Sequence, residues 1–167
     1  EHPLSVHGLM HNAITNAWRG DPYPIDTLMI FMANMAWNST MNTSEVRKML
    51  VDKQLSGPNK GQYKIPFIVV ADAFQSEMTA FADLILPDTT YLERHDAMSM
   101  LDRPISEFDG PCDSVRVPVV PPLGQCKPFQ EVLVELASRL KLPAFTTAEG
   151  ERKYKDYPDF IVRYETA

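Results

Sequence analysis

The stretch that decides the fold is Pro66-Phe-Ile-Val-Val-Ala-Asp72, a short, continuously apolar run that ends in a carboxylate. A run of this length between turn signals is typical of a strand buried on both faces, as in a parallel sheet. An earlier run, Thr27-Leu-Met-Ile-Phe-Met-Ala33, has the same character and is followed by Asn34. We predict that residues 28–33 and 67–71 are neighbouring or near-neighbouring central strands of one parallel sheet.

Helical segments separate the predicted strands. Asn42 is placed to cap a helix that follows the first strand, and Ser76 is placed to cap a short helix over residues 77–82. Residues 84–86 predict a third, very short strand that Pro87 closes. Strands that alternate with helices imply right-handed crossovers and a parallel sheet.

The carboxyl-terminal half of the chain has a different character. Proline recurs between residues 104 and 128, which predicts an extended, irregular connector without a regular helix. Apolar residues then recur at helical spacing over 129–140, with Pro128 at the first helical position and Pro143 after the end. Further helical segments are expected over 4–18 and 159–164. The expected fold class is α/β: a parallel Rossmann-like sheet flanked by helices, followed by a Pro-rich connector and a further helix.

Composition and charge exclude several classes of function. The 167 residues carry 16 Lys and Arg against 22 Asp and Glu, a net charge of −6, which argues against a basic nucleic-acid-binding face. No apolar run approaches the roughly 20 residues of a membrane span, and we expect no signal peptide in residues 1–20. The sequence contains no GxGxxG, no P-loop and no GxSxG motif. Cys112 and Cys126 form no CxxC pair and are expected to be ordinary thiols.

Asn34 and Asp72 are the candidate ligand-binding pair, because each follows a predicted strand. Ligands of open parallel sheets bind at the carboxyl ends of the strands. A carboxylate there can accept two hydrogen bonds from a planar donor edge such as guanine N1–H and N2–H. The acidic surroundings of Asp72 favour a base over a phosphate as its neighbour. The alternative is that Asp72 only caps the turn into Ser76.

Other polar groups are expected to have structural roles. His7 and His11 stand four residues apart, but no third ligand is near in sequence, so we expect ordinary histidines on a helix surface. We expect the methionines around the first strand to fill the core. A solvated acidic face, and no acid–base pair, is expected from Asp83, Asp88, Glu93, Asp96 and Asp102. We therefore predict no catalytic residue and no metal ligand in this chain.

The segment Ala82-Asp-Leu-Ile-Leu-Pro-Asp-Thr-Thr-Tyr-Leu-Glu-Arg94 resembles a signature of the molybdopterin oxidoreductase family, the dimethyl sulfoxide reductase type. Residues 30–34, 69–77 and 127–142 resemble three further family segments in the same order, so the resemblance spans about residues 25–143. The residues around Arg94 are most similar to the branch that acts on sulfite, thiosulfate and polysulfide.

This resemblance implies an enzyme whose catalytic subunit binds a bis(molybdopterin guanine dinucleotide) cofactor around molybdenum or tungsten. We expect residues 1–105 to be the α/β dinucleotide-binding domain and 106–127 the Pro-rich connector. The helix and terminal segment, 128–167, are expected to pack on the same domain. The cysteine cluster for a [4Fe-4S] centre and the metal-ligand segment are not in this sequence, so the isolated chain is expected to be inactive and free of metal.

Residue by residue, the resemblance implies dinucleotide contacts from Asn34, Ala71, Asp72, Arg94 and Gln130. Arg94 stands where the family has Lys, which keeps the charge but changes the geometry. Gln130 stands where relatives often carry Asp, so a charge is lost.

The implied partners are the remaining domains of the same catalytic subunit and an iron–sulfur electron-transfer subunit, with or without a membrane anchor subunit. The parent enzyme would transfer electrons to or from an inorganic sulfur compound. The chain would be soluble, on the cytoplasmic or periplasmic face of a bacterial membrane complex. Two alternatives stay open: a non-catalytic α/β interaction module, and a stand-alone guanine-nucleotide binder, which the missing P-loop disfavours.

Overall fold

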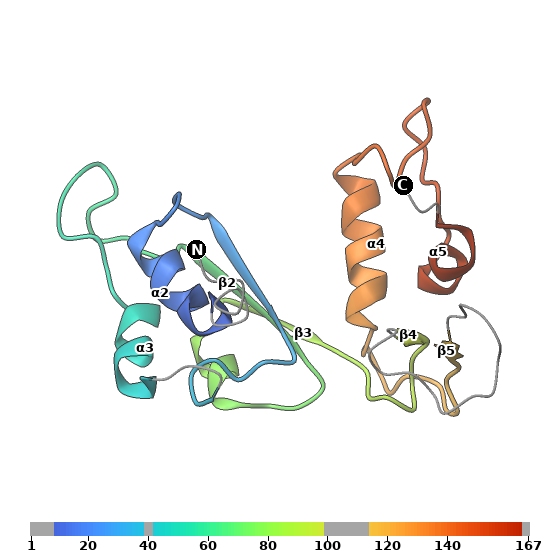
Figure 1. The fold of residues 1–167 in the computed structure, drawn as a ribbon, viewed down its shortest axis with the longest axis horizontal. Coiled ribbons are helices and arrows are strands. Elements are labelled where there is room, and N and C mark those ends of the chain that lie inside the picture. Colours follow the sequence, from blue (N-terminus) through green and yellow to red (C-terminus); the bar gives the residue numbers. More distant parts are fainter. Residues whose placement is uncertain (1–8, 39–41, 99–113, 165–167) are drawn as a thin grey trace. The chain divides into compact units, whose positions relative to one another are not determined.

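The computed structural model describes residues 9–38, 42–98 and 114–164 (Figure 1). The chain forms two compact units, residues 1–87 and 88–167. The first unit contains the predicted sheet, and the second contains two helices and a pair of short strands. The predicted domain limits at residues 105 and 127 stay predictions.

Three parallel strands form the sheet of the first unit. They are β1 (Thr27–Phe31), β2 (Phe67–Asp72) and β3 (Leu84–Pro87), in the order β1-β2-β3. The sheet confirms the prediction that the first two apolar runs pair side by side in parallel. Burial on both faces holds for β2, whose four inner residues are all buried, but not for β1, where only Ile30 is buried. The reason is position, since β2 is the middle strand and β1 lies at the edge.

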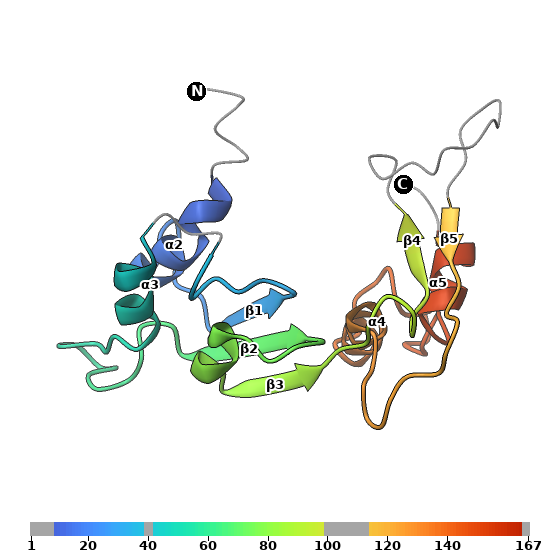
Figure 2. The same cartoon turned by 90° about the horizontal axis from the view of Figure 1, so that it is seen from below.

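Two helices, α2 (Ala13–Arg19) and α3 (Thr43–Leu50), cover one face of this sheet (Figure 2). A 3-10 turn, η1 (Leu9–Asn12), precedes α2, so the helix predicted over 4–18 is regular from Ala13 onward, and residues 4–8 lie outside the described chain. The helices and strands share one apolar core, whose buried members include Ile14, Ala17, Ile30, Val46, Leu50, Ile68 and Val70.

The two predicted helix caps have different outcomes. Asn42 caps α3 as expected, since its side chain accepts a hydrogen bond from the Glu45 N–H at 3.3 Å. The segment after β2 is a 3-10 helix, η2 (Glu77–Phe81), and the prediction that Ser76 caps it is wrong. The Asn34 side chain takes that place, because its oxygen accepts from the Met78 N–H at 3.1 Å.

The second unit contains β4 (Asp96–Met98), β5 (Ser114–Arg116), α4 (Phe129–Arg139) and α5 (Tyr157–Arg163). Strands β4 and β5 pair antiparallel, a pairing that the sequence did not predict. The described part of the Pro-rich segment, 114–128, contains no helix, as expected.

Both helices of the second unit differ in detail from the prediction. Pro128 is the residue before α4 and not its first helical residue, because its ψ of 132° is extended. The apolar stripe of α4 is only partly buried: Phe129 and Ala137 are enclosed, whereas Leu133 and Leu136 are exposed. Helix α5 starts two residues earlier than predicted, because the Asp156 side chain accepts from the Asp159 N–H at 2.9 Å.

Across residues 9–38, 42–98 and 114–164, the structure contains no helix with the length and apolar character needed to cross a membrane.

The cap of α3 generates a prediction about stability. Replacing Asn42 with Ala should lower the free energy of unfolding by about 1 kcal/mol, because the Glu45 N–H loses its acceptor. Urea denaturation followed by circular dichroism measures this change. The matched control is Asn59→Ala in the exposed loop before β2, which should have no effect. Equal stability of the two variants would contradict the capping role.

Candidate functional site

The carboxyl-terminal edge of the sheet places three of the predicted site residues together. Phe31 and Ala71 are partners in the β1–β2 ladder, and the Met32 N–H donates to the Ala71 carbonyl at 3.0 Å. Asn34 and Asp72 therefore follow neighbouring strands at the same edge. Ala71 itself is only 1% exposed, so any contact it makes with a ligand must come from its backbone.

Asn34 fastens the loop after β1 to the start of η2. Its side-chain oxygen accepts from the Met78 N–H, and its amide donates to the Glu77 carboxylate. Its carbonyl accepts from the N–H groups of Trp37 and Asn38. Both ends of the Asn34 side chain are thus engaged by the protein, which gives this residue a role in shaping the edge.

Glu77 contacts the candidate residue Asn34, and the sequence analysis did not single it out. The hydrogen bond from Asn34 is the main cause that lowers the pKa of Glu77, and the positive charge of Arg47 acts in the same direction. Glu77 is therefore ionised at neutral pH, and it adds a fixed negative charge beside Asn34. The sequence gives one indication of a role for Glu77: it follows Ser76 within residues 69–77, a segment that resembles the family.

Asp72 closes a tight turn with one oxygen and leaves the other available. Its Oδ1 accepts from the Phe74 N–H at 3.0 Å, which is the contact expected of a residue that only caps its turn. Its Oδ2 receives no hydrogen bond from any residue in the described ranges, and the residue is half-buried. The Phe74 N–H thus orients the carboxylate at the carboxyl end of β2, and Oδ2 stays without a partner among the described residues.

Arg94 lies in the second unit and is enclosed by protein. Its side chain is 3% exposed, and its Nη1 donates to Asp88 Oδ2 at 2.8 Å and to the Thr89 carbonyl at 3.2 Å. The Asp88 side chain is 0% exposed, and its other oxygen accepts from the Phe129 N–H at 2.9 Å. This buried ion pair therefore holds the amino-terminal end of α4 to the segment that follows β3.

Asp96 connects Arg94 to the other predicted residue of the second unit, Gln130. Its carboxylate accepts from Arg94 Nε at 3.3 Å, from Arg116 Nη2 at 2.6 Å and from Gln130 Nε2 at 3.5 Å. The ring of Tyr91 lies under both guanidinium groups, 5.0 Å from Arg94 and 4.5 Å from Arg116. Arg94 and Gln130 thus belong to one network, and Asp96 is its centre.

Burial around this network affects a tyrosine of α5. Burial is the main cause that raises the pKa of Tyr157, and the negative charge of Asp96 adds to it. Tyr157 therefore stays protonated at neutral pH.

The prediction of a solvated acidic face is wrong for Asp88, whose side chain is fully buried, whereas Asp83 is exposed as expected. Each of these carboxylates accepts hydrogen bonds that a local sequence pattern does not reveal. Asp83 accepts from the Ile68 N–H at 2.7 Å, and Glu93 accepts from the N–H groups of Thr90 and Leu123. Asp88 and Asp96 pair with arginines, and Asp102 lies outside the described residues.

No group of three His, Cys, Asp or Glu side chains that could hold a metal occurs in the described part of the chain. His11 borders a pocket of about 240 Å³ between α2 and α3. Cys126 is a free thiol, whereas His7 and Cys112 lie outside the described residues.

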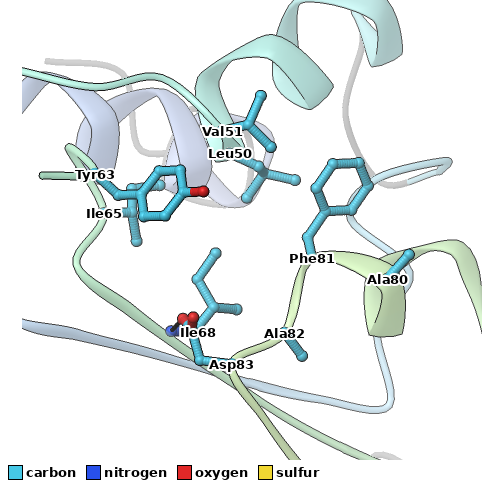
Figure 3. Close-up of a pocket in the computed structure, with 9 residues that line it drawn as sticks. All are labelled: Leu50, Val51, Tyr63, Ile65, Ile68, Ala80, Phe81, Ala82 and Asp83. Carbon is cyan, nitrogen blue, oxygen red and sulfur yellow. Dashed lines mark hydrogen bonds between the residues drawn. The ribbon is translucent and has the colours of Figure 1, made fainter. Parts of the chain in front are cut away.

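A second pocket, of about 200 Å³, lies at the opposite end of the sheet (Figure 3). Ile65, Ile68 and Asp83 belong to its lining, at the amino-terminal ends of β2 and β3. The Asp83 carboxylate faces the Ile68 N–H in Figure 3 and accepts a hydrogen bond from it. Asp83 therefore stabilises the start of β2. None of the five predicted site residues lines this pocket.

Comparison with known proteins gives consistent matches. Residues 24–139 match the molybdopterin oxidoreductase family. Over all 167 residues the chain is 80% identical to a sulfite dehydrogenase subunit of Allochromatium vinosum. It is 30% identical over 137 residues, 81% of the chain, to the molybdopterin-containing subunit of a thiosulfate reductase from Salmonella typhimurium. It is also 30% identical over 157 residues, 90% of the chain, to a tetrathionate reductase subunit of the same organism.

These relatives are much longer than the chain. The chain spans 17% of the sulfite dehydrogenase subunit, 15% of the thiosulfate reductase subunit and 14% of the tetrathionate reductase subunit.

The buried ion pair generates a prediction about Arg94. Arg94→Met should destabilise the protein by about 3–5 kcal/mol, because it leaves the Asp88 carboxylate buried without a positive partner. Arg139→Met is the control, since Arg139 makes an exposed pair with Glu135 worth at most about 1 kcal/mol. Chemical denaturation of both variants measures the difference. A loss from Arg94→Met no larger than that of the control would contradict the structural role.

The Asn34–Glu77 contact generates a prediction about pH. A glutamate whose pKa is lower in the folded than in the unfolded chain stabilises the fold above about pH 4.5, its ordinary value. That contribution is lost as the pH falls through the folded pKa. Asn34→Ala should therefore raise the pKa of Glu77 and cost more stability at neutral than at acidic pH. Thermal unfolding across this range, with NMR titration of the Glu77 carboxyl carbon, measures both effects, and a cost independent of pH would refute the contact.

Proposed function

The chain belongs to the molybdopterin oxidoreductase family, and on this premise we propose that it is the part of a catalytic subunit that anchors a molybdopterin guanine dinucleotide. The observation that carries the proposal is the position of Asp72. Its carboxylate stands at the carboxyl end of the central strand, oriented by the Phe74 N–H, with Oδ2 unused by the described residues. Open parallel sheets bind their ligands at this edge.

The chemistry of the edge fits a guanine base. A carboxylate accepts hydrogen bonds only, and guanine offers two adjacent donors, N1–H and N2–H. Glu77 adds a second negative charge at the same edge, which makes it a poor place for a pyrophosphate. In addition, Ser76 Oγ is a buried atom without a hydrogen-bond partner in the described ranges. The turn after β2 therefore has a second polar atom that can hydrogen-bond to a ligand.

The proposed contributions of the five residues differ. Asp72 binds the guanine edge, the backbone of Ala71 borders the base, and Asn34 holds the loop that forms the other side. Arg94 and Gln130 are proposed to contribute from the second unit through the network around Asp96. The internal contacts of Arg94 favour an indirect contribution, since its guanidinium already serves Asp88, Asp96 and the Thr89 carbonyl.

We propose that the parent enzyme carries a bis(molybdopterin guanine dinucleotide) cofactor with molybdenum or tungsten, and a [4Fe-4S] centre elsewhere in the subunit. When bound, the metal cofactor supplies the oxidation–reduction chemistry. The share of this chain is to bind and orient one guanine end.

An inorganic sulfur compound is the proposed substrate of the parent enzyme. The proposal is supported by three relatives, whose names specify sulfite, thiosulfate and tetrathionate. The names of these relatives also describe subunits, which supports a partner subunit that accepts or delivers electrons. We propose an iron–sulfur subunit for this role, with or without a membrane anchor subunit, on one face of a bacterial membrane.

Asp72→Asn in the full-length subunit tests the proposed function. The amide keeps the turn contact with the Phe74 N–H but loses charge and one acceptor, so dinucleotide binding should weaken roughly tenfold to over a hundredfold. The measurement is the amount of GMP released by acid hydrolysis, per mole of purified protein. Asp26→Asn, at the exposed amino-terminal end of β1, is the matched control and should retain full content. Unchanged content in Asp72→Asn with a lowered melting temperature would mean that Asp72 only caps its turn.

A further inference from the structure

Phe74 exposes its ring in the tight turn that the Asp72 carboxylate closes. Its side chain is 72% exposed, and its N–H is the group that holds Asp72 Oδ1 at 3.0 Å. The ring and the carboxylate therefore belong to one tight turn at the carboxyl end of β2. Because this hydrogen bond closes the turn, Asp72 and Phe74 leave the backbone from neighbouring positions at the same end of β2.

Phe74 differs from Trp37, an exposed aromatic residue in the described part of the loop after β1. The Trp37 ring already carries the Arg47 guanidinium, 5.4 Å from its centre. No ring pair and no cation–π contact among the described residues involves Phe74. Among the described residues of this edge, Phe74 thus exposes a ring that no neighbouring ring or cation covers.

A purine site needs two kinds of contact, one to the edge of the base and one to its face. Hydrogen bonds at the edge select the base, whereas stacking on an aromatic ring holds any base. Asp72 can supply the first contact and cannot supply the second. The residue two positions along the same turn is an exposed Phe, which can supply it.

We propose that Phe74 is the stacking residue for the guanine base whose edge Asp72 binds. This inference rests on the proposed function, since it assigns the second half of the same base site. The two residues then have different roles. Asp72 selects guanine, and Phe74 contributes affinity that does not depend on which purine is bound.

The experiment titrates the cofactor-free full-length subunit with GMP and with IMP, which lacks the N2 amino group, by isothermal calorimetry. Phe74→Leu keeps an apolar side chain but removes the ring, so binding of both nucleotides should weaken by the same factor, roughly 5- to 150-fold. Phe74→Tyr keeps the ring and should bind both nucleotides as the unaltered subunit does. Phe67→Leu is the matched control, because Phe67 is a partly exposed Phe at the opposite end of β2. It should change neither affinity.

Asp72→Asn distinguishes a failure of the stacking role of Phe74 from a failure of the proposed guanine site. It should reduce the preference for GMP over IMP, whereas Phe74→Leu should leave that preference intact. Loss of preference in Asp72→Asn with unchanged affinities in Phe74→Leu would overturn the stacking role and leave the proposed function standing. If the unaltered subunit bound neither nucleotide, or if Asp72→Asn bound both normally, the proposed function would fail first.

The remaining explanation for Phe74 is packing against another part of the longer subunit. In that case Phe74→Leu would retain both affinities, because leucine preserves apolar contact, or would lower only the melting temperature. Either result, or failure of the Leu variant to fold, would overturn the inference.

Discussion

The pairing of β2 with a parallel strand on each side is the constraint on which the candidate site depends. It aligns Phe31 with Ala71, and Ala71 with Leu86, so the carboxyl ends of the strands lie at one edge. A shift of one residue in this register would turn Asp72 and the buried valines to the opposite faces of the sheet. The Asn34 side chain then ties the loop after β1 to η2, which fixes the second side of the edge.

The second unit depends on a different interaction, the buried pair of Asp88 and Arg94. Charges so fully enclosed are costly to remove from water, and they persist here because each has several partners. Asp88 uses one oxygen for Arg94 and the other for the first N–H of α4, which has no acceptor within its own helix. A lysine in place of Arg94 could not reach Asp88 and Asp96 with the same fork of donors. The departure from the family pattern at this position therefore has a structural consequence in this chain.

The sequence predicted the parts of the fold that depend on local pattern. Two apolar runs indicated the parallel strands, and the Asn42 cap followed from its place before a helical segment. Local patterns could not predict contacts between residues that are far apart in sequence. The Asn34 side chain, 44 residues away from Met78, accepts the η2 N–H group that the Ser76 side chain leaves uncapped. The three-residue strands β4 and β5 are too short to show a period.

The same distinction applies to the candidate site. Asp72 was predicted because a carboxylate after a buried strand occupies a position that topology alone identifies. Glu77 and Asp96 were missed, because their roles come from partners that the chain brings together only when folded. Arg94 was expected at the ligand from its place in a motif, whereas the structure encloses it beside Asp88.

The most direct measurement is an experimental structure of the full-length subunit with its cofactor bound. We expect N1 and N2 of one guanine to lie within hydrogen-bond distance, about 3 Å, of the Asp72 carboxylate. A pyrophosphate at this position, or a carboxyl-terminal sheet edge that no part of the cofactor touches, would contradict it.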